Sequence, residues 1–133
     1  MITQLIYMSE PFGYDSAVLS AILATARRNN ARHGITGALI CRHDVYLQLI
    51  EGDAAAIDQL FARISVDDRH LAVTLLNRAE VAGRVLPDWA MLHDPARSWL
   101  WSSAEVGRGA IRQATPAALQ QVFARAAVEA STA

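Results

Sequence analysis

The chain has 133 residues and a mass of 14.5 kDa, enough for one domain and too little for a second, catalytic one. Hydrophobic residues make up 53% of the chain and charged residues 19%, which allows a buried core and argues against intrinsic disorder. All 12 basic residues are arginine, and with 13 acids the net charge is −1, a balance that argues against direct nucleic-acid binding.

The first part of the chain predicts a strand and then a helix. Residues 2–8 are rich in β-branched and aromatic side chains and are followed by a polar stretch with proline and glycine, which is typical of a strand and a loop. Asp15 or Ser16 caps the helix that follows, and Gly34 ends it. Its apolar residues recur with the spacing of one helical face: Val18, Leu19, Ile22, Leu23 and Ala26.

A β-hairpin and a second helix are predicted next. Residues 36–41 and 45–50 are short apolar runs joined by a tight polar connection, which predicts the hairpin. Asp53 follows as the N-cap of the second helix. The apolar stripe of that helix consists of Ile57, Leu60, Phe61 and Ile64.

Two more strands complete the pattern, one beginning with the apolar run 71–76, whose end the sequence does not mark, and one around residues 89–93. The resulting order is β-α-β-β-α-β with an additional strand. It predicts an α+β, ferredoxin-like domain, with two helices on one face of a mostly antiparallel sheet.

Beyond about residue 94 the chain changes character, so we divide it into a core, 1–94, and a C-terminal helical extension, 95–133. Residues 97–106 predict a short helix that carries Trp99 and Trp101. An alanine-rich helix then begins at Pro116 and ends near residue 129. We expect these helices to cap the open sheet face. A sheet face capped in this way is also a natural dimer surface, so we expect a homo-oligomer.

Two adjacent amides lie where the first helix should be apolar. At about 100° per residue, Asn29 and Asn30 continue the direction of the buried stripe. A buried amide without hydrogen-bond partners costs a few kcal/mol, so something polar should meet both side chains. The alternative is that they lie in the last, fraying turn and cap the helix beside Gly34.

A glutamine and a tyrosine stand out in the strands. Gln48 interrupts a run that is otherwise apolar on both faces, which suggests a strand covered on both sides. Gln48 is an ordinary surface residue if its face is open to water. Tyr7 has a similar place in the first strand, where a single tyrosine usually packs with its hydroxyl at the edge.

Arg63, Asp67 and His70 are grouped at the end of the second helix and in the loop after it. They are either a solvated helix terminus with a weak surface ion pair or an anchor for a phosphorylated or sugar-bearing ligand.

Several kinds of site can be set aside. The four histidines lack a paired ligand spacing, and Cys41 alone can complete neither a zinc site nor an internal disulfide, so no metal is expected. The sequence also lacks a glycine-rich phosphate loop and a nucleophile elbow. No apolar run approaches the roughly 18 residues of a membrane span, and the amino terminus is not signal-like. We therefore expect a cytoplasmic protein without a membrane partner.

Over residues 2 to about 93 the sequence resembles the BLUF domains, which are flavin-binding sensors of blue light. Each motif alone is weak, but the set is specific in this order and spacing. The motifs are LIYMS at 5–9, ARRNN at 26–30, GITG at 34–37, LQLIEG at 47–52, DDRH at 67–70 and PDWAM at 87–91.

The resemblance implies a role for each of the singled-out residues. Tyr7 and Gln48 would form the photoactive pair, and FAD, with FMN as the alternative, would be the cofactor. The resemblance further implies that the ring is sandwiched and hydrogen-bonded by Ile22, Ile64, Asn29 and Asn30. Arg63, Asp67 and His70 would hold the ribityl and phosphate tail, and Trp89 and Met91 would belong to the strand that transmits the signal.

The resemblance therefore implies a photoreceptor and not an enzyme. We expect a short, stand-alone sensor in which a Tyr–Gln–flavin hydrogen-bond rearrangement signals to a separate protein partner. Two alternatives remain. A flavin-dependent redox enzyme would need a second substrate or nicotinamide site, and a flavin-free interaction module would purify as a colourless protein.

Overall fold

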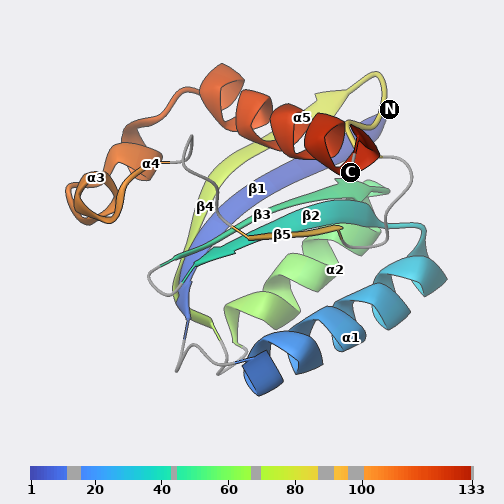
Figure 1. Cartoon of the computed structure of the whole chain (residues 1–133). Coiled ribbons are helices and arrows are strands. Elements are labelled where there is room, and N and C mark those ends of the chain that lie inside the picture. Colours follow the sequence, from blue (N-terminus) through green and yellow to red (C-terminus); the bar gives the residue numbers. More distant parts are fainter. Residues whose placement is uncertain (12–15, 43–44, 67–69, 87–91, 96–100, 133) are drawn as a thin grey trace.

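The computed structural model describes residues 1–11, 16–42, 45–66, 70–86, 92–95 and 101–132. The helices and strands of the core follow the expected order, and three further helices come after them in the chain (Figure 1). They are β1 (Ile2–Pro11), α1 (Ser16–His33), β2 (Thr36–Arg42), β3 (Val45–Gly52), α2 (Ala54–Ser65), β4 (His70–Val81), β5 (Leu92–Pro95), α3 (Ser103–Gly107), α4 (Ala110–Gln113) and α5 (Pro116–Thr132).

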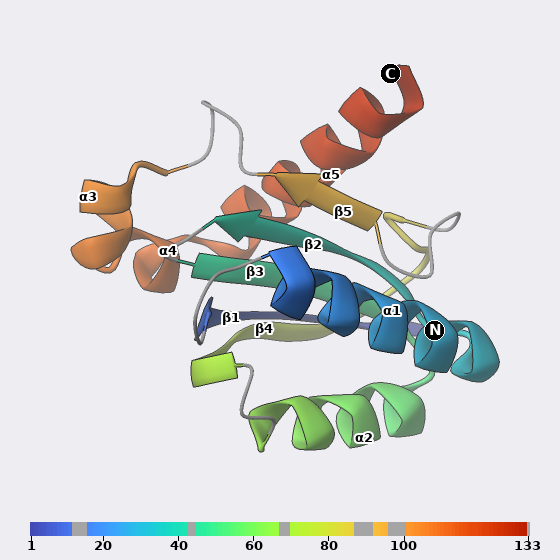
Figure 2. The ribbon, with the colours of Figure 1, turned by 60° about the horizontal axis from the view of Figure 1, so that its bottom comes forward.

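The five strands form one sheet in the order β4-β1-β3-β2-β5. The β1 strand is antiparallel to β4 and β3, and β3 is antiparallel to β2, whereas β5 lies parallel to β2 at the edge. Helices α1 and α2 lie on one face of this sheet and α5 lies across the other (Figures 1 and 2). The predicted α+β fold, with two helices on one face and a helical cap, is confirmed.

Strand β3 is the most deeply covered element of the sheet, and all eight of its residues are buried. Because side chains alternate between the two faces, each strand contributes to two separate cores. One core lies under α1 and α2 and includes Tyr7, Ile22, Tyr46 and Ile57. The other lies under α5 and includes Ile6, Leu47, Leu49 and Phe123. The apolar run in β3 therefore reflects burial on both faces, as predicted.

The ends of the helices next to the sheet follow local sequence signals. The side chain of Asp53 accepts a hydrogen bond from the backbone nitrogen of Ala55 at 3.2 Å, which confirms it as the N-cap of α2. Gly34 follows α1 with a φ of 67°, a conformation that glycine adopts without strain. The cap expected at Asp15 falls outside the described residues. No helix in the part of the chain that the structure describes has the length and apolarity needed to cross a membrane.

Strand β4 (His70–Val81) extends five residues beyond the end of the apolar run 71–76, because it lies at the edge of the sheet, where polar residues are tolerated. Its second half contains Arg78, which is exposed, and Asn77, which is half-buried. Of the last predicted strand, 89–93, only Leu92 and His93 fall in β5, since 87–91 lie outside the described residues.

Of the helix predicted over residues 97–106, positions 97–100 lie outside the described residues, and the described part differs at its start. Trp101 and Ser102 are not helical, and α3 begins at Ser103. The reason is a capping box, in which the Ser102 hydroxyl accepts from the Glu105 nitrogen and the Glu105 carboxylate accepts from the Ser102 nitrogen. These hydrogen bonds to the carboxylate lower the pKa of Glu105. Trp101 packs against the core under α5, whereas Trp99 lies outside the described residues.

We expect α5 to be an integral part of the folded domain. Phe123 is completely buried against the sheet, so Phe123→Ala should lower the free energy of unfolding by about 3–5 kcal/mol in urea denaturation. Val128→Ala on the same helix is the control, because Val128 is 63% exposed, and it should change stability by less than about 0.5 kcal/mol. Equal stabilities of the two variants would contradict the observed packing of α5.

Candidate functional site

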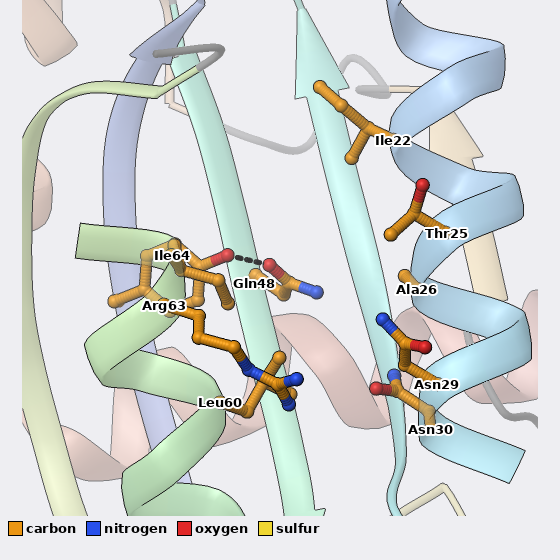
Figure 3. Close-up of a pocket in the computed structure, with 10 residues that line it drawn as sticks. Ile22, Thr25, Ala26, Asn29, Asn30, Gln48, Leu60, Arg63 and Ile64 are labelled. Atoms are coloured by element: carbon orange, nitrogen blue, oxygen red, sulfur yellow. Dashed lines mark hydrogen bonds between the residues drawn. The ribbon is translucent and has the colours of Figure 1, made fainter. Parts of the chain in front are cut away.

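A pocket lies between α1 and α2, with β1 and β3 as its floor (Figure 3). It encloses about 660 Å³ of empty space, part of which opens to solvent. The pocket is lined by Tyr7, Ile22, Thr25, Ala26, Asn29, Asn30, Gln48, Leu60, Arg63 and Ile64.

Seven of the residues singled out in the sequence therefore meet in one place. They are Tyr7, Ile22, Asn29, Asn30, Gln48, Arg63 and Ile64. Three others, Asp67, Trp89 and Met91, lie outside the described residues. His70 begins β4, and its side chain is not among those described.

The α1 wall is built by one face of the helix. Ile22, Thr25, Ala26 and Asn29 follow the i, i+3, i+4, i+7 spacing, and their side chains point into the slot in Figure 3. Thr25 was not singled out in the sequence, although it lies on the same face, because a threonine on a half-buried stripe carries no distinctive signal. Ala26 belonged to the predicted apolar stripe, but nothing in the sequence marks it as a pocket residue.

The two asparagines are not fraying helix caps. Asn30 is 1% exposed, Asn29 is half-buried, and both side chains line the pocket. Other groups pair with their backbone carbonyls: His33 Nδ1 with the Asn29 oxygen at 2.8 Å, and the Ile35 nitrogen with the Asn30 oxygen at 2.9 Å. These bonds to the backbone carbonyls close the end of the helix. The prediction that both amides continue the buried stripe is confirmed.

The α2 wall is provided by Leu60, Arg63 and Ile64. In Figure 3 the Arg63 side chain extends from α2 into the space between the helices. Arg63 is exposed, so it adds a cation at the mouth of the pocket and not in its interior. Leu60 belonged to the predicted apolar stripe, but the pattern alone could not separate a pocket-lining leucine from a core leucine.

Helix α2 is held to the edge of the sheet by a bidentate ion pair. Arg78 of β4 donates from Nε and Nη2 to the two carboxylate oxygens of Asp58, each at 3.0 Å. The hydrogen bond to Asp58 raises the pKa of Arg78. Both side chains are largely exposed, so the pair orients α2 more than it stabilises the fold.

Helix α2 also contacts the floor of the pocket through an aromatic pair. The Phe61 ring makes a tilted contact with the Tyr7 ring, with centroids 5.6 Å apart.

The floor of the pocket holds a tyrosine–glutamine pair. Tyr7 of β1 and Gln48 of β3 are cross-strand partners, and the Tyr7 hydroxyl donates to Gln48 Oε1, the bond drawn as a dashed line in Figure 3. Tyr7 is fully buried and Gln48 is 5% exposed. Gln48 is therefore not a surface residue, because its face of the sheet is covered by α1 and α2.

This arrangement suits a flat heteroaromatic ring. Ile22 and Ile64 offer apolar contacts from opposite walls, and the amides of Asn29 and Asn30 offer donors and acceptors along one edge. Gln48 adds a third amide at the floor, already hydrogen-bonded to a phenol. A ring with apolar faces and a polar edge would satisfy each of these groups.

Comparison with known proteins agrees with this geometry. Residues 2–92 match the family described as sensors of blue-light using FAD, the BLUF domains. The chain is 38% identical over 92 residues to the photoactivated adenylate cyclase subunit beta of Euglena gracilis, which covers 68% of this chain and 11% of that protein. It thus spans about a tenth of the length of this curated relative.

Solved structures show the same fold. The dark-state structure of BlrB, a BLUF protein, superimposes with a TM-score of 0.76 at 27% identity and covers 98% of this chain and 96% of that one. A bacterial light-regulated adenylyl cyclase gives a TM-score of 0.69 at 28% identity, over 85% of this chain and 33% of that one. The chain belongs to the BLUF family, and its core is a flavin-binding sensor domain for blue light.

Proposed function

We propose that Tyr7 and Gln48 are the photoactive pair of this sensor. The observation that carries the proposal is the buried hydrogen bond from the Tyr7 hydroxyl to Gln48 Oε1 at the floor of the pocket. It joins a group that can lose an electron and a proton to a group that can accept the proton and rotate. Among the pocket-lining residues, Tyr7 is the one with a phenol.

The walls of the pocket are proposed to hold the flavin ring in a fixed orientation. Ile22 and Ile64 contact its two faces, and Asn29 and Asn30 hydrogen-bond its polar edge. Arg63, which lies at the mouth, binds the ribityl and phosphate tail together with Asp67 and His70. We propose FAD as the cofactor, because the family is described by its use of FAD, with FMN as the alternative.

When bound, the flavin absorbs blue light and in its excited state is a strong oxidant. Tyr7 is the proposed electron donor. A phenol that has lost an electron is a strong acid, so its proton leaves Tyr7 Oη for Gln48 Oε1, the atom with which it is hydrogen-bonded. Return of the electron and the proton restores the phenol, while Gln48 remains in an altered orientation or tautomer. No substrate is consumed.

The proposed output is a conformational signal and not a chemical product. The core, 1–94, senses light, and the extension, 95–133, together with Trp89 and Met91, passes the change to a protein partner. In line with this division, α5 covers the sheet face opposite the pocket. We propose that the protein acts in the cytoplasm, as a homo-oligomer and without enzymatic activity of its own.

The role of Tyr7 can be tested by removing one oxygen atom. Tyr7→Phe keeps the buried ring but removes the proton donor, so the flavin-loaded variant should lose the light-induced, reversible red shift of the flavin absorption band. The measurement is the absorption spectrum before and after blue light. Tyr46→Phe is the matched control, because Tyr46 of β3 is equally buried on the same face of the sheet but does not line the pocket. A normal red shift in Tyr7→Phe would overturn the proposed pair.

The role of the asparagines can be tested by flavin titration of the apoprotein. Asn30→Leu removes a hydrogen-bonding amide and should weaken flavin binding about tenfold or more, as expected for an unmatched buried polar group. Ala31→Leu changes the neighbouring exposed position and should bind flavin like the parent protein. The parent should bind FAD more tightly than FMN if Arg63 contacts the longer tail. Unchanged affinity in Asn30→Leu would remove this residue from the proposed site.

A further inference from the structure

A buried polar network lies on the sheet face opposite the pocket. Glu51 of β3 is completely buried and accepts a hydrogen bond from Gln4 Nε2 of β1 at 3.3 Å. Gln4 is 1% exposed, and its oxygen accepts from Gln120 Nε2 of α5 at 2.9 Å. The network therefore joins the two central strands to the C-terminal helix.

The same carboxylate also fixes the chain after β4. The backbone nitrogens of Val85 and Leu86 donate to the Glu51 carboxylate at 2.9–3.0 Å. Next to them, Arg84 donates to the Glu51 carbonyl oxygen at 3.0 Å and to Gly34 O at 2.8 Å. Glu51 thus binds the segment 85–86 directly and is connected to α5 through Gln4.

This network is connected to the photoactive pair through the strands themselves. In the β1–β3 ladder, Tyr7 faces Gln48 and, three positions along, Gln4 faces Glu51. An offset of three residues places the second pair on the other face of the sheet, because side chains alternate. The two cross-strand pairs therefore share one ladder, with the pocket on one side and α5 on the other.

We infer that the Gln4–Glu51 pair couples the photoactive pair to α5 through Gln120. The inference rests on the proposed function of Tyr7 and Gln48. When their hydrogen bond rearranges, the spacing of β1 and β3 changes at that point of the ladder. The Gln4–Glu51 bond, at 3.3 Å, is longer than a typical N–H···O hydrogen bond, so a small displacement is enough to break it. Gln4 then turns away from Gln120, and α5 loses this hydrogen bond to the sheet.

The test compares two neighbouring glutamines of α5 in the flavin-loaded protein. Gln120→Ala removes the bond to Gln4, whereas Gln121→Ala removes an exposed amide of the same size. The readout is amide hydrogen exchange of α5 in the dark and under blue light, with the flavin spectrum recorded on the same samples. The parent and Gln121→Ala should exchange faster in the light.

Gln120→Ala should already exchange about fivefold faster in the dark, the effect expected for loss of one neutral hydrogen bond, and light should add nothing further. Its red shift should remain normal, because Gln120 is not part of the pocket. Two results would overturn the coupling alone. One is an increase in α5 amide exchange under light in Gln120→Ala that equals the increase in the parent. The other is a parent protein that shows the red shift but no light-induced change in α5 amide exchange. Absence of the red shift in the parent would overturn the proposed function and the coupling with it.

Discussion

The hydrogen bond between Tyr7 and Gln48 depends on a sheet that is covered on both faces. A phenol and an amide retain a fixed partner only where water cannot compete, and here α1 and α2 exclude it from one side. On the other side, α5 covers the same two strands with Leu119 and Phe123. Without that second layer, β1 and β3 would form a half-solvated sheet, and their spacing would be less well determined.

The walls of the pocket differ in how they are held. The α1 wall ends in a turn at Gly34, where the Ile35 nitrogen donates to the Asn30 carbonyl oxygen. The α2 wall is tied to the exposed edge strand by the Arg78–Asp58 pair. Helix α2 is in addition packed against the sheet by the fully buried Ile57, so its position rests on core contacts as well as on this exposed ion pair.

Much of the core fold could be predicted from hydrophobic periodicity and caps. The described part of the α1 stripe (Ile22, Leu23 and Ala26), the burial of β3 on both faces and the cap at Asp53 each agree with the structure. The end of β4 could not be predicted, because an edge strand needs no apolar residues on its exposed side. The start of α3 follows from the capping box of Ser102 and Glu105, a local signal that the apolar pattern of residues 97–106 does not contain.

The site was predictable only in part. Asn29, Asn30 and Gln48 were conspicuous because amides interrupt apolar patterns, and the structure brings them to one pocket. Thr25, Ala26 and Leu60 were not, since their side chains are as common in a core as in a ligand site. The buried network of Gln4, Glu51 and Gln120 could not be predicted from the sequence. Gln4 and Gln120 are 116 residues apart in the chain and meet only when α5 folds onto the sheet.

The absorption spectrum of the purified protein, recorded in the dark, after blue light and after return to darkness, tests the central claim most directly. We expect a yellow protein with bound flavin whose main band shifts slightly to longer wavelength in the light and returns in the dark without any added reductant. A colourless protein that takes up no flavin would contradict this account. So would a flavin that is unaffected by light but is bleached by NADH, because that behaviour is typical of a redox enzyme.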